Sequence, residues 1–174
     1  MKVMPIGLMT MAAFLTVAAP ARAQSDAEVQ ETIAQFKKGD AGMQAWFKDA
    51  YGYAVFPSVG KGAVVVGGAH GKGLVYEQGK LIGETKMTEV SVGLQAGGQA
   101  FSEVIFFKDK TALDDFTRGN FEMAAGLSAV ALKEGASKDL NYSKGVAVMT
   151  ATKGGLMVEA KVGGQKFSFE RIKD

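Results

Sequence analysis

The sequence predicts an α+β protein in which N-terminal helices pack on a curved antiparallel β-sheet, either open or barrel-like. Apolar residues recur at helical spacing up to residue 50, and from residue 53 onward the period falls to two, which is typical of half-buried strands. Glycine accounts for 23 of the 174 residues, about twice its usual share of roughly 7%. Because glycine weakens a flat strand, its interleaving with β-branched residues indicates bends, bulges or close backbone approaches, and therefore a curved sheet.

The first 23 residues are expected to be an export signal that is not part of the fold. Lys2 gives a positive start, residues 6–19 are uncharged and mostly apolar, and residues 21–23 supply the small side chains that a signal peptidase recognises. A membrane anchor is the alternative, but the apolar run is shorter than the ~20 residues of a comfortable spanning helix. We expect cleavage after Ala23, a periplasmic or secreted protein, and a single domain over residues 24–174.

The charge and cysteine content limit the classes of partner. The leader holds two of the 20 basic residues and no acidic one, so the 18 basic residues that remain balance the 18 acidic residues. A neutral domain argues against nucleic-acid binding and leaves only local basic patches to attract an anionic partner. The chain has no cysteine, so an exported form would have no disulfides and would depend on burial for its stability.

Two helices are expected before the sheet. Ser25 and Glu28 form a capping box that would begin the first helix, whose apolar stripe runs to Phe36. Residues 37–40 end or interrupt this helix, and Asp40 can cap a second helix that ends at Ala50. Apolar stripes of this kind face a core more often than a membrane.

Short connections between the strands favour antiparallel pairing. The strands are predicted over residues 53–56, 62–69, 73–77, 80–88, 90–98, 103–107, 145–152, 156–162 and 166–171, with breaks at Gly60, Gly71 and Gln78-Gly79. Asp109 is expected to cap a helix that ends near Arg118. Residues 121–132 fit a helix by their alanines and a strand by their alternation, and residues 133–142 are expected to form a loop.

The sequence offers little for catalysis or metal binding, so we expect no enzyme activity, no cofactor and no metal. Residues 67–73 are glycine-rich, but Val66 stands where a phosphate-binding loop needs its first glycine, and Gly73 replaces the Ser or Thr that would hold magnesium. A hairpin turn is the favoured interpretation. His70 is the only histidine, and the chain has no cysteine, so no ordinary zinc or redox-metal ligand set is available. The sequence also has no G-x-S-x-G motif to supply a serine nucleophile.

Local basic groups are the candidate binding residues. They fall into a helical set and a set near the first expected hairpin: Lys37, Lys38 and Lys48, and Lys61, His70 and Lys72. Either set suits a lipid head group, whereas a solvated surface lysine is the commoner case for any single residue. On one continuous helix, positions 37 and 48 would share a face because they are about three turns apart. A break at Gly39-Asp40 would remove that alignment.

A series of ordered stretches over residues 30–170 carries a family resemblance. They are AVFPSVGKG from Ala54, VGGAHGKGLV from Val66, VGLQAGGQ from Val92, residues 121–131, and YSKGV from Tyr142. In order and spacing they resemble the SYLF family, a lipid-binding domain of eukaryotic membrane and actin-associated proteins and of many bacterial exported proteins. The resemblance favours a strand over residues 121–132.

The resemblance implies a non-enzymatic domain that binds phospholipids, with phosphoinositides as the eukaryotic ligands. Family lipid contacts are attributed to the N-terminal amphipathic and basic region, which corresponds here to residues 29–48. Actin binding, known for the yeast relatives, is not expected of an exported protein. We therefore expect an envelope protein that binds anionic phospholipid head groups at a membrane surface. The alternative is a structural or stress-related periplasmic protein that acts through a protein partner.

Overall fold

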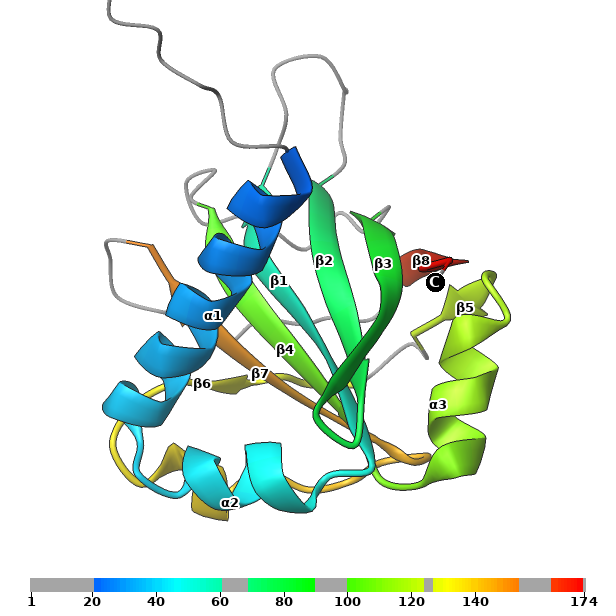
Figure 1. Cartoon of the computed structure of the whole chain (residues 1–174). Coiled ribbons are helices and arrows are strands. Elements are labelled where there is room, and N and C mark those ends of the chain that lie inside the picture. Colours follow the sequence, from blue (N-terminus) through cyan, green and yellow to red (C-terminus); the bar gives the residue numbers. More distant parts are fainter. Residues whose placement is uncertain (1–20, 61–68, 90–99, 124–126, 154–163, 174) are drawn as a thin grey trace, which may run out of the picture.

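The computed structural model describes residues 21–60, 69–89, 100–123, 127–153 and 164–173, which form helices around one curled β-sheet (Figure 1). The elements in chain order are α1 (Ala21–Gly39), α2 (Met43–Asp49), β1 (Gly52–Gly60), β2 (Ala69–Glu77), β3 (Lys80–Glu89), β4 (Phe101–Phe107), α3 (Lys110–Thr117), β5 (Phe121–Glu122), β6 (Val130–Ala131), the 3₁₀ turn η1 (Ala136–Lys138), β7 (Val146–Thr152) and β8 (Gln165–Arg171).

The strands form a single sheet with the order β5-β8-β3-β2-β1-β4-β7-β6. All neighbouring pairs are antiparallel except β6 and β7, which are parallel. The predicted α+β class with a curved, mainly antiparallel sheet and N-terminal helices is therefore confirmed.

The curl of the sheet brings together strands that are far apart in its order. In a flat sheet β8 and β4 would lie about 19 Å apart, because four strand spacings separate them. Instead, Gln165 Nε2 of β8 donates a hydrogen bond of 3.0 Å to Glu103 Oε2 of β4. The rings of Phe56 on β1 and Phe167 on β8 also have centroids 5.8 Å apart. These contacts define the concave face of the sheet.

Each face of the sheet carries its own hydrophobic core. The concave core holds aromatic side chains of the sheet together with Leu113 and Phe116 of α3. The convex core lies under α1 and α2, and it includes Val29, Phe36 and Phe47 of these helices. Because α1 contacts β1 and β2, the helix covers only part of the convex face.

The helix boundaries differ in part from the prediction. The first helix begins at Ala21, so Ser25 lies inside it and the expected capping box is wrong. The break after residue 39 is confirmed, since α1 ends at Gly39 and α2 begins at Met43. The cap of α3 is confirmed, because the side chain of Asp109 accepts a hydrogen bond from the backbone N–H of Ala112 at 3.0 Å.

The turn predicted at Gly71 is wrong. Strand β2 starts at Ala69 and continues through Gly71 and Gly73, so His70 and Lys72 lie on a strand and not in a hairpin turn. The glycines serve close packing here: a Cβ atom on Gly73 would lie 2.5 Å from the backbone oxygen of Val55 and 2.8 Å from the Phe56 ring. The turn at Gln78-Gly79 is confirmed, with φ of 49° and 80° at the two residues.

Residues 121–132 do not form the single strand that was expected. They contribute β5 and β6, which pair with β8 and β7 at opposite edges of the sheet. The predicted strands over 80–88, 103–107, 145–152 and 166–171 are confirmed as β3, β4, β7 and β8 with shifts of one or two residues. The strands predicted over 90–98 and 156–162, and residues 62–68 of another, lie outside the described residues.

The contact between β8 and β4 gives a direct test of the curl. We expect Gln165→Ala to lower the free energy of unfolding by about 2–4 kcal/mol, because it leaves a void and removes a hydrogen bond from a buried carboxyl group. Ser168→Ala, on the exposed face of the same strand, should change it by less than about 0.5 kcal/mol. Urea unfolding followed by circular dichroism measures both. Equal, small effects would show that this contact does not stabilise the curl.

Candidate functional site

The helical set of basic residues, called here the basic corner, consists of Lys37 and Lys38 before the turn from α1 into α2 and Lys48 near the end of α2. Lys37 and Lys38 are in the last turn of α1, and Lys48 is in the last turn of α2. Because the helix breaks after Gly39, the alignment expected from one continuous helix is absent. Instead, Lys37 Nζ lies 5.3 Å from the centroid of the Phe47 ring, so the turn places the end of α1 near the residue that precedes Lys48.

Asp40 stabilises the turn between the two helices. Its carboxylate accepts hydrogen bonds from the backbone N–H groups of Ser137 at 2.6 Å and Gly42 at 2.9 Å. The bond from Ser137 is the main cause that lowers the pKa of Asp40 below its usual value. The N-cap residue of α2 is Gly42, two residues after Asp40, so the predicted cap at Asp40 is wrong. Asp40 instead ties the turn to η1 through Ser137.

Interactions within the protein explain why lysines occur at some positions of the basic corner. Lysines in the last turn of a helix interact favourably with its dipole, and Lys37 also makes the cation–π contact with Phe47. Lys38 and Lys48 are exposed. Within the described part of the chain, neither makes an ion pair or a side-chain hydrogen bond, which leaves both ammonium groups available to a partner.

Two half-buried aromatic rings pack against each other at α2. The ring centroids of Trp46 and Tyr142 are 5.0 Å apart, and Trp46 Nε1 donates a hydrogen bond of 3.3 Å to the backbone oxygen of Ser137. Trp and Tyr side chains with one apolar and one polar end are typical of membrane–water interfaces.

The second set of candidates does not join the basic corner. Lys61 lies outside the described residues, and His70 and Lys72 are exposed on the convex face of β2. Lys72 lies near Ser25 and Glu28, with which it lines one groove. These two residues belong to the N-terminal part of α1, about 13–18 Å along the helix from Lys37. The five predicted residues that the structure describes therefore fall in two separate places.

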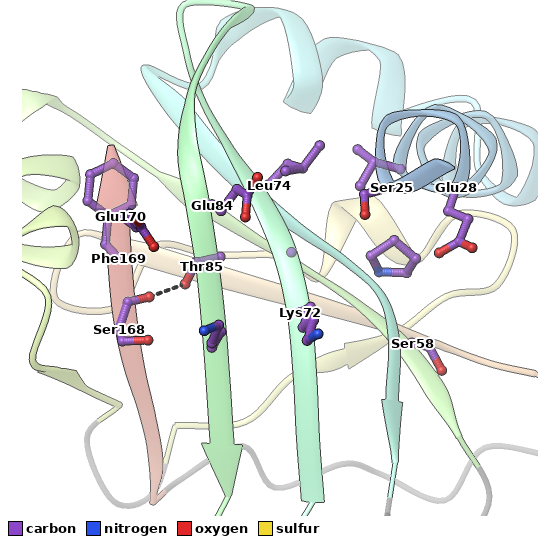
Figure 2. Close-up of a pocket in the computed structure, with 14 residues that line it drawn as sticks. Ser25, Glu28, Ser58, Lys72, Leu74, Glu84, Thr85, Ser168, Phe169 and Glu170 are labelled. Atoms are coloured by element: carbon purple, nitrogen blue, oxygen red, sulfur yellow. Dashed lines mark hydrogen bonds between the residues drawn. The ribbon is translucent and has the colours of Figure 1, made fainter. Parts of the chain in front are cut away.

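The groove beside Lys72 contains residues that the sequence alone did not single out. It has a volume of about 460 Å³ and is lined by Ser25, Glu28, Val29, Pro57, Ser58, Lys72, Gly73, Leu74, Glu84, Thr85, Lys86, Ser168, Phe169 and Glu170. Figure 2 shows Lys72 on β2, Glu84 on β3, and Ser168 and Glu170 on β8, beside Ser25 and Glu28 of α1. Alternation along a strand places Glu84 and Lys86, or Ser168 and Glu170, on one face of the sheet. The register that brings the strands' side chains together comes only from the structure.

The described residues show no arrangement for metal chemistry or membrane spanning. Among them, no three His, Asp or Glu side chains gather closely enough to hold a metal ion. No helix formed by these residues is both long enough and apolar enough to cross a bilayer.

Comparisons with known proteins identify relatives. Residues 88–172 match the Ysc84 family model, described as "Las17-binding protein actin regulator". The chain is also 32% identical over 127 residues to Beta cell expansion factor A from Aeromonas veronii, an alignment that covers 72% of this chain and 48% of that protein. The chain thus spans about half the length of this curated relative.

The bonds to Asp40 predict a dependence of stability on pH. Since the pKa of Asp40 is lowered in the folded state, its stabilising contribution is complete above the unfolded pKa of about 3.9 and is lost as the pH falls through the folded value. We expect Asp40→Asn to lower the free energy of unfolding by about 1–3 kcal/mol at pH 7. Urea unfolding should show this difference shrink below about pH 4. A difference that is independent of pH would contradict a charged role for Asp40.

Proposed function

Because the chain belongs to the SYLF family, which is not an enzyme family, we propose that it binds phospholipid membrane surfaces and catalyses no reaction. The ligand is the anionic head group of a phospholipid, and the basic corner is the main contact. The observation that carries the proposal is that α2 bears the half-buried ring of Trp46, packed against Tyr142, while exposed lysines Lys38 and Lys48 lie in the last turns of α1 and α2.

The charge balance supports attraction by a patch. The full chain has a formal net charge of only +2, so overall charge does little to bring it to an anionic surface. Each lysine near such a surface contributes about 1 kcal/mol, and the contribution falls off within a Debye length. The three lysines of the basic corner are enough for weak binding that depends on salt.

The concave core supports binding at a surface over carriage of a lipid inside the sheet. Its rings make close contacts, such as 4.8 Å between the centroids of Phe107 and Phe116 and 5.2 Å between those of Phe116 and Phe167. These rings fill the position where an acyl chain would have to lie. A bound lipid therefore keeps its tail in the bilayer.

A protein partner is the second candidate function, and the family model's description as a Las17-binding protein favours it. In this case the chain would be a structural or stress-related envelope protein, and the rings of Trp46 and Tyr142 would contact the partner. We do not propose actin as the partner, because we expect the chain to be exported.

The basic corner can be tested by charge removal. We expect the triple variant Lys37→Gln, Lys38→Gln, Lys48→Gln to bind vesicles with anionic head groups at least tenfold more weakly at low salt, since it loses about 3 kcal/mol of attraction. Co-sedimentation with vesicles across salt concentrations measures the effect. The parent protein should itself lose binding as salt rises.

A matched control separates the corner from net charge. The variant Lys110→Gln, Arg118→Gln, Lys173→Gln removes the same number of charges from α3 and the C-terminal end, and it should bind like the parent protein. If a folded corner variant sediments as well as the control, the lipid contact is elsewhere. If neither the parent nor the variants bind vesicles, the protein-partner function is favoured.

A further inference from the structure

The convex face of β2, β3 and β8 carries an unusual charge pattern. Lys72 of β2 lies directly opposite Lys86 of β3 in the strand register, and Glu84 of β3 lies directly opposite Glu170 of β8. Like charges directly opposite each other destabilise a sheet, and a sheet optimised for stability would pair Lys with Glu. The pattern therefore indicates a role other than stability.

None of these four side chains has a partner within the described part of the chain. All four are exposed, and the ion pairs formed there join other residues. Their charges therefore face the groove of about 460 Å³, which all four line.

The positive and negative pairs are separated by a short, fixed distance. Lys86 and Glu84 are two residues apart on β3, which places them about 6.6–6.8 Å apart along one face of the strand. The groove thus has a positive centre beside a negative one, each made by two side chains from neighbouring strands. Ser168 adds a hydroxyl group next to Lys86, its partner in the register.

We propose that this groove binds a zwitterionic phosphodiester head group, with its phosphate at Lys72 and Lys86 and its ammonium at Glu84 and Glu170. Phosphoethanolamine and phosphocholine groups join these two charges through a short ethylene link that matches the neighbouring centres. An anionic head group without an ammonium fits less well, because it would present to the two carboxylates either a further negative charge, which is repelled, or neutral hydroxyl groups, which bind them more weakly than a cation does. The proposal rests on the proposed lipid function and adds a second site, distinct from the basic corner.

Soluble head groups test the groove without a membrane. We expect glycerophosphoethanolamine and glycerophosphocholine to shift the NMR signals of β2, β3 and β8, and glycerophosphoglycerol to bind more weakly. Lys72→Gln with Lys86→Gln should weaken binding of all three by about tenfold or more, because the charged donors to the phosphate are lost. Lys110→Gln with Lys173→Gln is the matched control and should bind like the parent protein.

The glutamate pair gives a signature that a general basic patch would not show. Glu84→Gln with Glu170→Gln should remove the preference for the ammonium-bearing head groups and make glycerophosphoglycerol bind at least as well as they do. Since all four residues are exposed, these variants should fold, which circular dichroism checks. Absence of signal shifts in β2, β3 and β8, or an unchanged preference in the glutamate variant, would overturn the proposal.

Vesicles then separate this site from the proposed membrane function. Binding of soluble head groups without binding to phosphatidylethanolamine or phosphatidylglycerol vesicles would support the groove and contradict the membrane function. The opposite result is also possible: the protein binds vesicles through the basic corner, mutation of Lys72 and Lys86 has no effect, and no soluble head group binds. This result would support the membrane function and contradict the groove.

Discussion

The closure of the sheet across its concave face is the constraint on which the rest of the structure depends. Aromatic rings of β1, β8 and α3 meet there, and Gln165 reaches Glu103 from a strand four positions away. Burial of these rings holds the sheet in its curl, and the close-packed glycines of β2 allow the rings to approach the backbone. Because these rings fill the concave side, the part of the chain that the structure describes presents its outer face and the helices on it to a ligand.

Under this constraint, the two sites that we propose lie on the surface, at the two ends of α1. At the C-terminal end, the turn held by Asp40 brings the ammonium group of Lys37 over the Phe47 ring, and the partner proposed for this end is a negatively charged interface. At the N-terminal end, the groove over β2, β3 and β8 presents positive and negative centres side by side, which suits a zwitterion. Binding at the first proposed site should depend on the salt concentration, because the site is a patch of charge. Binding at the second should depend on the distance between the two charges of the ligand.

Local signals in the sequence predicted what local interactions determine. The cap at Asp109, the turn at Gln78-Gly79 and the period-two strands that became β3, β4, β7 and β8 depend on near neighbours, and the structure confirms them. The turn expected at Gly71 is wrong because a glycine that permits a turn and a glycine that makes room for a side chain, here that of Val59, look alike in sequence. The pairing of Lys72 with Lys86 and the division of residues 121–132 between two edges depend on long-range register, which no local pattern encodes.

The central claim is that the chain meets a phospholipid membrane through the lysines of its outer surface. Acetylation of lysines, followed by mass spectrometry with and without anionic vesicles, tests it most directly because it reports on each side chain. The account predicts that Lys37, Lys38 and Lys48 lose reactivity when vesicles are added, whereas Lys110 and Lys173 keep theirs. Protection confined to Lys110 and Lys173, or no protection of any lysine under conditions where the protein co-sediments with vesicles, would contradict it.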